Sequence, residues 1–308
     1  MTEQPIDVVI VGAGPAGLQA AVHAVRKKAS VVVLGKPGQS SIWRAHVENY
    51  LGVDGVVEGK ELLAVALKQV KRFGAELIEE DVLHIAEAEG GGFRVRIESG
   101  RELLARTLIL ATGTSRKKLK VKGEKELTGR GVSYCVDCDA NFYRGAKVAV
   151  VGNESAAVDG ALTLTKYAAE VHLVAKALDI SPVLREKLAA SPVQLHEGAW
   201  VSEIEGENAV TGLLLDQGER LAVDGVFIEL GAKGAMGLAA ILGVMLDSET
   251  FSYIETNKQQ ETNIPGIYAA GDIAGPPWQM AKAVGDGCVA GWEAANYANR
   301  QKREAGQD

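Results

Sequence analysis

The 308-residue sequence lacks the features that define several classes of protein. It has no excess of positive charge, because 33 Lys and Arg against 40 Asp and Glu give a formal net charge of −7. That balance argues against nucleic acid as the main partner, since phosphate binding needs a positive field. No stretch reaches the roughly 18 uninterrupted apolar residues of a membrane span, and the early apolar run Val8 to Val11 is too short for a secretory signal. We therefore expect a cytoplasmic protein with no membrane or nucleic-acid partner.

Cysteine is also scarce, with three residues in all. This number is too small for the disulfide scaffold of a secreted domain. Cys288 falls in an apolar helical pattern and is expected in the core. The other two, Cys135 and Cys138, form a close pair, which in a reducing compartment indicates redox chemistry or a metal site.

The Cys135-Val-Asp-Cys138 pair is the chemical centre of the sequence. Its spacing allows a reducible disulfide, and thiols in such pairs are acidified. Reduction needs a proton as well as electrons, and Asp139 beside Cys138 is the candidate general acid. Zinc would need two further ligands, but there is no second CxxC and the five histidines are scattered, so we expect no metal. An inert structural pair is the other alternative.

Positive features begin with two strand–turn–helix–strand units. The first consists of Asp7–Val11, the turn Gly12–Gly17, an alanine-rich helical pattern over Leu18–Lys28 and the strand Ser30–Leu34. The second runs from Lys147–Val151 through Gly152 and another alanine-rich helix to Glu170–Val174. This duplication predicts two mononucleotide-binding folds in an α/β protein.

The second fold is predicted to be inserted into the first. A charged stretch, Ser115–Lys120, leaves the first domain, and Gly231–Gly234 marks the return. Near the end, Ile264–Asp272 predicts a turn, a buried strand and an exposed Gly-Asp. We therefore place one domain at residues 1–115 plus 245–308 and the inserted domain at 117–243.

The first glycine loop has the Gly12-x-Gly14-x-x-Gly17 spacing between a strand and a helix. Gly12 permits the tight turn, Gly14 lets backbone N–H groups approach a pyrophosphate, and Gly17 lets helix and strand pack closely. The acid that usually binds the ribose would fall near Leu34 or Gly35, and neither residue can do so. Lys36 or the turn backbone is the expected substitute.

Several motifs occur together in the order and spacing of one family. They are Gly12–Gly17, Val47–Tyr50, Ala111–Gly113, Gly131–Asp139 and Gly266–Asp272. Over nearly its whole length the chain resembles the low-molecular-weight thioredoxin reductases. This resemblance implies two Rossmann-like domains of the FAD/NAD(P)-binding pyridine nucleotide-disulfide oxidoreductase class II type, the second inserted into the first. It also implies a homodimer, FAD in the split domain, and thioredoxin or a thioredoxin-like protein as acceptor. Cys138 would face the flavin and Cys135 would exchange with the substrate disulfide.

Asn49, Thr112, Asp272 and Gln279 match family positions that usually touch FAD, and a helix starting near Gln279 would direct its positive end toward reduced flavin. The full expected flavin-binding set is Gly12, Gly14, Pro15, Ala16, Gly17, Gly35, Lys36, Asn49, Val82, Thr112, Gly113, Gly271, Asp272, Trp278, Gln279 and Met280.

The sequence departs from the family at its second dinucleotide loop. Glu154 stands where the pattern has its middle glycine, and it places a side chain and a negative charge where a pyrophosphate would lie. The family's basic cluster for the NADPH 2′-phosphate is replaced by Ala175-Lys-Ala177 and Ser181. Ala140 follows Asp139 where glycine is usual, and Trp278 replaces an arginine before Gln279. NADPH is therefore not expected.

An enzyme that keeps the flavin and the disulfide but loses the nicotinamide site needs another electron source. The pattern favours a resemblance to the ferredoxin-dependent flavin thioredoxin reductases, with ferredoxin as a possible partner. A close variant carries a second FAD, as in the diflavin-linked disulfide oxidoreductases, although Glu154 would require a shifted site for it. A conventional NAD(P)H-dependent reductase and a flavin-bound redox sensor that does not turn over remain the alternatives.

Overall fold

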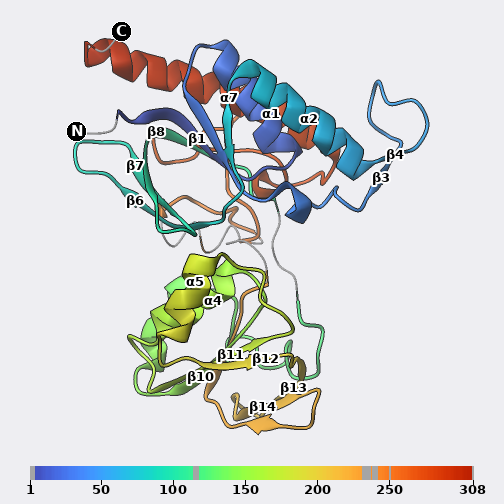
Figure 1. The fold of residues 1–308 in the computed structure, drawn as a ribbon, viewed down its shortest axis with the longest axis vertical. Coiled ribbons are helices and arrows are strands. Elements are labelled where there is room, and N and C mark those ends of the chain that lie inside the picture. Colours follow the sequence, from blue (N-terminus) through green and yellow to red (C-terminus); the bar gives the residue numbers. More distant parts are fainter. Residues whose placement is uncertain (1–3, 114–117, 231–236, 238–241, 250, 307–308) are drawn as a thin grey trace. The chain divides into compact units, whose positions relative to one another are not determined.

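The computed structural model describes residues 4–113, 118–230, 237, 242–249 and 251–306. The chain folds into two compact units (Figure 1). The first comprises Met1–Ile97, Arg101–Thr114 and Gly234–Asp308, and the second comprises Glu98–Gly100 and Ser115–Lys233. The connection predicted at Ser115–Lys120 lies partly outside the described residues, and the one predicted at Gly231–Gly234 lies wholly outside them.

The first unit is built on a seven-stranded sheet in the order β5-β2-β1-β8-β7-β6, with β17 also paired to β8. The pairings β5–β2, β2–β1, β1–β8 and β8–β17 are parallel, and β8–β7 and β7–β6 are antiparallel. Its strands are β1 (Ile6–Val11), β2 (Val31–Leu34), β5 (Glu76–Ile78), β6 (Val82–Glu87), β7 (Phe93–Ile97), β8 (Glu102–Leu110) and β17 (Ile267–Ala269). A short antiparallel pair is formed by β3 (His46–Val47) and β4 (Val57–Glu58).

The two faces of this sheet pack against different layers, because side chains alternate along a strand. From β1, Val8 and Ile10 join the helical core, whereas Val9 and Val11 pack with residues of β6 and β7. Figure 1 shows the three long helices together on one side of the sheet. They are α1 (Pro15–Arg26), α2 (Gly59–Phe73) and α7 (Met280–Glu304). The described part of this unit also contains two 3₁₀ turns, η1 (Pro37–Gln39) and η3 (Asp272–Ala274).

α1 and α7 touch through small residues. A Cβ added to Gly287 would lie 2.1 Å from the carbonyl oxygen of Ala16, and one added to Gly291 would lie 2.2 Å from that of Ala20. These distances leave no room for a side chain, so the two backbones meet directly. The alanine-rich pattern of α1 is therefore a helix–helix interface.

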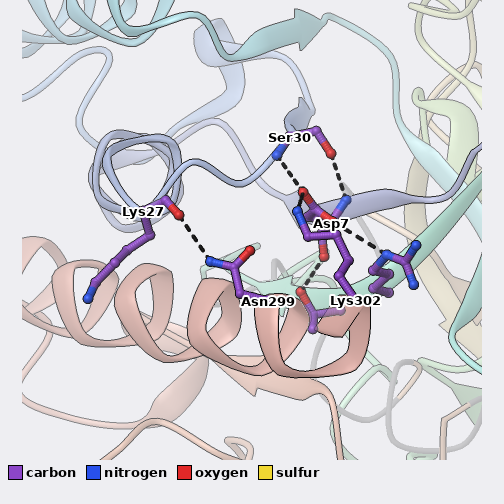
Figure 2. Close-up of polar contacts among 7 residues, drawn as sticks. Asp7, Lys27, Ser30, Asn299 and Lys302 are labelled. Atoms are coloured by element: carbon purple, nitrogen blue, oxygen red, sulfur yellow. Dashed lines mark hydrogen bonds and ion pairs between the residues drawn. The ribbon is translucent and has the colours of Figure 1, made fainter. Parts of the chain in front are cut away.

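A buried carboxylate fixes the far end of α7 to the sheet (Figure 2). The Asp7 side chain accepts from the Ser30 backbone N–H at 2.8 Å and forms ion pairs with Lys302 at 2.9 Å and Arg106 at 3.4 Å. Asn299 of α7 also donates to the Lys27 carbonyl oxygen at 3.0 Å. Asp7 is 4% exposed, so these partners stabilise its buried charge in place of water.

The second unit has a parallel five-stranded sheet in the order β12-β11-β10-β16-β9 and an antiparallel sheet β13-β14-β15. The strands are β9 (Val132–Ser133), β10 (Lys147–Val151), β11 (Glu170–Ala175), β12 (Gln194–Glu197), β13 (Val201–Glu205), β14 (Gly212–Leu215), β15 (Arg220–Leu221) and β16 (Gly225–Ile228). The helical elements are α3 (Val136–Asp139), η2 (Ala140–Tyr143), α4 (Ser155–Leu164) and α5 (Pro182–Ala189). Both predicted strand–turn–helix–strand units are thus present.

Three sequence expectations need correction. The first helix begins at Pro15 instead of Leu18, because Gly14 precedes it and Pro15 takes its first position. Gly271 is buried instead of exposed, since a Cβ there would lie 2.9 Å from the Ala16 side chain, and Asp272 is partly buried. Cys288 is partly exposed and not a full core residue.

Replacing Asp7 by Asn should destabilise the first unit. The change leaves Lys302 and Arg106 beside a neutral amide, and breaking such a largely buried pair costs about 3 kcal/mol. Urea denaturation followed by tryptophan fluorescence measures this loss. Asp54→Asn, at an exposed position of the same unit, is the matched control. An Asp7 variant as stable as the Asp54 variant would contradict the role given to the ion pairs.

The second unit should lose stability in mild acid because of His172. Burial lowers the pKa of His172 below its ordinary value of 6.5, and the charges of His196 and Lys147 lower it further. Glu170 raises this pKa but does not offset the lowering. The unfolded chain then binds more protons than the folded chain just below pH 6.5, so the stabilisation is complete above that pH and is lost as the pH falls. One such proton gives a slope of at most about 1.4 kcal/mol per pH unit.

Denaturant unfolding of the wild type and of His172→Gln, measured from neutral to mildly acidic pH, checks this expectation. The variant should show the smaller slope. Some slope should remain, because burial followed by the charge of Arg26 also lowers the pKa of His23 in the first unit. Equal slopes in the two proteins would show that His172 is not the group responsible.

Candidate active site

Cys135 and Cys138 form a disulfide in the second unit, with a sulfur–sulfur distance of 2.11 Å. The pair spans the start of α3: Cys135 precedes the helix, and the Cys138 backbone N–H donates to the Cys135 sulfur at 3.2 Å. Cys135 is buried and Cys138 is partly exposed. The disulfide expected from the CxxC spacing is therefore present.

Asp139, the last residue of α3, is tied to the disulfide through a serine. Ser133, at the end of β9, donates its hydroxyl hydrogen to Asp139 Oδ2 at 2.7 Å. The same hydroxyl oxygen accepts from the Cys135 backbone N–H at 3.1 Å. The candidate acid and the first cysteine are thus held by one buried side chain.

Two further side chains surround the disulfide loop. Glu229, directly after β16, accepts from the Val136 backbone N–H at 3.1 Å. Burial raises the pKa of the Tyr143 hydroxyl above its ordinary value, and the charge of Asp139 raises it further, so Tyr143 is neutral at physiological pH. Its ring packs edge-on against Phe227 at a centroid distance of 5.0 Å. The disulfide therefore lies in a partly apolar setting with acidic groups nearby.

The second glycine loop joins β10 to α4. Gly152 is required by packing, because a Cβ there would lie 2.1 Å from the Glu229 carbonyl oxygen. Asn153 is bound to the segment that follows β11: its Oδ1 accepts from Lys176 N at 2.9 Å, and its carbonyl oxygen accepts from Asp179 N at 2.8 Å. Glu154 forms an isolated parallel β-bridge with Asp179. The loop is thus bonded to the segment that follows β11.

The segment after β11 uses its polar groups internally. Ser181 caps α5 by accepting from Leu184 N at 3.2 Å. Arg185 pairs with Glu197 at 3.3 Å, and the same carboxylate accepts from Leu178 N at 3.0 Å. Lys176 is the one cationic side chain between positions 175 and 181, and its Nζ lies 5.5 Å from the centre of the Trp200 ring.

The first glycine loop has the close contacts that its spacing predicts. Gly12 has φ +122°, and a Cβ on it would lie 2.2 Å from the Ala111 carbonyl oxygen. A Cβ on Gly17 would lie 1.9 Å from the Gly12 carbonyl oxygen. Gly14, in contrast, meets nothing closer than 3.4 Å, at Ser40 Oγ. The space beside Gly14 and the start of α1 suits an anionic group bound by backbone N–H groups.

Thr112 provides independent evidence for a bound group. Its Oγ1 is buried and has no hydrogen-bond partner among the described residues. An unpaired buried hydroxyl is costly and calls for an explanation such as a ligand. The residue follows β8 and adjoins Gly12, since a Cβ on Gly12 would lie 3.0 Å from Thr112 N. The site therefore fits a cofactor with polar groups such as FAD.

The third part of this site is the start of α7. Gln279 precedes the helix, and its side-chain oxygen accepts from Asn49 Nδ2 at 3.1 Å. Burial raises the pKa of the Asp272 carboxyl, while nearby Lys282 lowers it and Asp286 raises it. Lys282 donates to the carbonyl oxygens of Gly271 and Gly275 at 2.8 and 2.9 Å, so α7 holds the Gly-Asp turn.

Part of the expected flavin-binding set is linked by contacts within the first unit: Gly12 lies against Gly17, Gly35 and Thr112, and Asn49 binds Gln279. A Cβ added to Gly35 would lie 3.2 Å from the Ala13 nitrogen, and one added to Gly271 would lie 2.9 Å from the Ala16 side chain. Lys36 is paired with Asp81 at 3.3 Å, one residue before Val82. Pro15 opens α1, Met280 opens α7, Gly113 has φ +73°, and Trp278 is 63% exposed.

Five residues that shape these sites are not predicted from the sequence. They are Ser133, Asn153, Glu229, Lys282 and Asp286. A Lys–Asp pair four residues apart on a predicted helix is a detectable signal for Lys282 and Asp286. Asn153 and Glu229 act through contacts between distant segments. Ser133 contacts Cys135 and Asp139, two and six residues along the chain, but no motif marks a serine for that role.

The described residues contain neither a membrane-spanning helix nor a metal-binding cluster. No helix in that part of the chain is long and apolar enough to cross a membrane. No group of three or more His, Cys, Asp or Glu side chains within it is arranged to hold a metal ion.

Comparison with known proteins matches residues 6–301 to the model of the pyridine nucleotide-disulphide oxidoreductase family. Thioredoxin reductases of Listeria monocytogenes and Bacillus subtilis are each 36% identical, over 97% and 96% of this chain and 96% of each relative.

Solved structures agree with this assignment. The atypical thioredoxin reductase TRi from Desulfovibrio vulgaris Hildenborough is 35% identical, with a TM-score of 0.83 over 97% of this chain and 99% of that one. A ferredoxin-flavin thioredoxin reductase from Clostridium acetobutylicum is 32% identical, with a TM-score of 0.70 over 96% and 99%. The chain therefore belongs to the pyridine nucleotide-disulphide oxidoreductase family, as a thioredoxin reductase-like flavoprotein disulfide oxidoreductase.

Proposed function

We propose that this enzyme passes electrons from FAD through the Cys135–Cys138 disulfide to thioredoxin or a thioredoxin-like protein, and that its electron donor is not NADPH. Ferredoxin is the donor we favour, and a second flavin is the variant. The observation that carries the donor proposal is the second glycine loop. There Glu154 replaces a glycine, and Asn153 binds the segment that would otherwise receive the nucleotide.

FAD is proposed to bind in residues 1–115 and 245–308, with 117–243 as the redox-disulfide domain. The N–H groups at the start of α1 would hold the pyrophosphate beside Gly14, and the unpaired Thr112 hydroxyl would bind a polar group of the cofactor. Asp272 would accept from a ribityl hydroxyl. Gln279, fixed by Asn49, would lie where α7 directs its positive end. When bound, FAD supplies the electrons that open the disulfide.

The roles of the cysteines differ in this proposal. Cys138 faces the flavin, and Cys135 attacks the substrate disulfide once it is released as a thiolate. Cys138 then attacks the mixed disulfide, which reforms the Cys135–Cys138 bond and frees the reduced substrate. Asp139 supplies the proton that the leaving sulfur needs. The hydrogen bond from Ser133, which orients the Asp139 carboxyl, supports this assignment.

Electrostatics supports the exclusion of NADPH. Like charges near 4 Å repel by about 4 kcal/mol close to a protein surface, and Glu154 and Asp179 both lie at the second glycine loop. A 2′-phosphate would meet only Lys176 in the segment 175–181, because Ser181 is used as a helix cap. Arg185 is already paired with Glu197. The loop therefore offers a nucleotide less positive charge than it needs.

The comparisons support both sides of the donor question. Likeness to a ferredoxin-flavin thioredoxin reductase favours ferredoxin. The relatives named thioredoxin reductase keep a conventional NAD(P)H-dependent enzyme as the second candidate. A homodimer in the cytoplasm is part of the proposal, and it rests on the family resemblance and on a cysteine content suited to a reducing compartment.

Anaerobic mixing should separate the donors. Millimolar NADPH or NADH should leave the flavin absorbance of the FAD-loaded protein unchanged for minutes, because the second loop repels and obstructs a dinucleotide. Reduced ferredoxin should bleach it within seconds. Stopped-flow absorbance makes the measurement, and reduced viologen is the positive control for a competent flavin. Rapid bleaching by micromolar NADPH would establish the conventional reductase instead.

Repeated turnover should distinguish a catalyst from a redox sensor. With reduced viologen as donor, the wild type should reduce many equivalents of oxidised thioredoxin, because the disulfide is regenerated in each cycle. Cys135→Ser and Cys138→Ser should each lose this activity, while Cys288→Ser, at the remaining cysteine, should keep it. Thiol formation is the readout. A wild type that stops after one equivalent would support the sensor.

A further inference from the structure

We propose that Ser133 is a positioning residue that holds Asp139 for proton transfer to the sulfur released when the Cys135–Cys138 disulfide opens. This inference rests on the proposed role of Asp139 as the acid. It goes beyond that role by assigning a function to a side chain that neither the cysteine spacing nor the flavin site includes.

The geometry defines where the Ser133 hydroxyl hydrogen points. The Cys135 N–H donates to its oxygen at 3.1 Å. The hydrogen then has two possible acceptors, Asp139 Oδ2 at 2.7 Å and the Cys135 carbonyl oxygen at 3.3 Å. The shorter contact, to an ionisable acceptor, is the stronger one. Ser133 is therefore a donor to the carboxyl group and an acceptor from the cysteine backbone at the same time.

This arrangement makes Cys135, Ser133 and Asp139 one connected unit. Ser133 is 6% exposed and lies at the end of β9, whose register with β16 pairs it with Phe227. A buried strand residue moves little, so both of its partners inherit a fixed position. Within the described part of the chain, the Asp139 carboxyl makes no second side-chain hydrogen bond. We place the transferable proton on its other oxygen.

The chemistry requires such positioning. When a thiolate attacks one sulfur of Cys135–Cys138, a new sulfur–sulfur bond forms and the old one breaks. The departing sulfur takes the electron pair of the broken bond and a proton. A carboxylic acid assists only if its proton lies within hydrogen-bond reach of that sulfur. A freely rotating Asp139 would satisfy this condition for a fraction of the time.

The other ionisable groups on the packed elements do not replace Ser133. Tyr143 belongs to η2, Asp159 to α4 and Asp137 to α3 itself. Glu229 accepts from the Val136 N–H. Of these groups, none forms a hydrogen bond with Asp139 among the described residues.

The test uses a double-mutant cycle in the FAD-loaded protein. Dithiothreitol reduces the disulfide: its first thiolate opens Cys135–Cys138, and its second closes the dithiothreitol ring and releases both cysteines. Acid quenching, alkylation and mass spectrometry count the free thiols over time, so the readout does not depend on the electron donor. The proteins are wild type, S133A, D139N, S133A/D139N and S133T, with S202A as a control at an exposed serine of the same unit.

D139N should slow thiol release by roughly tenfold or more, as general acid catalysis implies. S133A should slow it by about threefold to tenfold, and the double variant should match D139N alone, because Ser133 acts through Asp139. S133T, which keeps the hydroxyl, should recover most of the rate, and S202A should equal the wild type.

Two results would overturn the inference alone: S133A as fast as the wild type, or a double variant slowed by the product of the two single effects. Unchanged rates in D139N would instead remove the proposed acid. Should S133A fail to fold, D139E provides the decision, because it keeps an acid but moves it by one methylene from Ser133. Positioning predicts a loss of at least about threefold, and wild-type rates in D139E would refute it.

Discussion

The first unit depends on backbone segments that approach too closely for any side chain. Gly12 meets the end of β8, Gly17 meets Gly12, and Gly287 meets the start of α1, each within 2.2 Å of where a Cβ would lie. These contacts set the direction of α1 and leave its first N–H groups open beside Gly14. They also bring α7, and with it Gln279 and the Gly-Asp turn, to the same end of the sheet. A cofactor site arises from three segments because their backbones can touch.

In the second glycine loop, the position that packing requires to be glycine differs from the position that a pyrophosphate requires to be glycine. Gly152 has no space for a Cβ, so the fold requires a glycine there whether or not a nucleotide binds. Position 154 has no such constraint, and a glutamate is accommodated directly before α4. The chain thus keeps the glycine that packing demands and lacks the one that a pyrophosphate demands. If Glu154 were a chance substitution on a surface loop, nothing would require Asn153 to bind the facing segment as well.

The sequence was most informative where the signal is local. The strands, the glycine loops, the start of α7 and the disulfide all follow from residues within a few positions of one another. It was least informative for partners that meet only after folding. Glu229 contacts the cysteine loop from the end of β16, Asn153 reaches a segment more than twenty residues away, and Gly271 is buried by packing against α1. Ser133 is close to its partners in the sequence, but only the folded path of β9 and α3 turns its hydroxyl toward Asp139. No periodicity distinguishes these residues from ordinary polar or turn positions.

The disulfide gives a physical reason for the parallel sheet of the second unit that does not depend on a nucleotide. β9 carries Ser133 and pairs with β16, and β16 ends beside Glu229, so both side chains that hold the cysteine backbone are placed by the parallel sheet. β10, which leads to the altered glycine loop, is the other neighbour of β16. Dismantling that sheet would release the Cys135 and Val136 N–H groups and the Asp139 carboxyl together. The sheet is therefore needed to position the disulfide loop, whichever donor supplies the electrons.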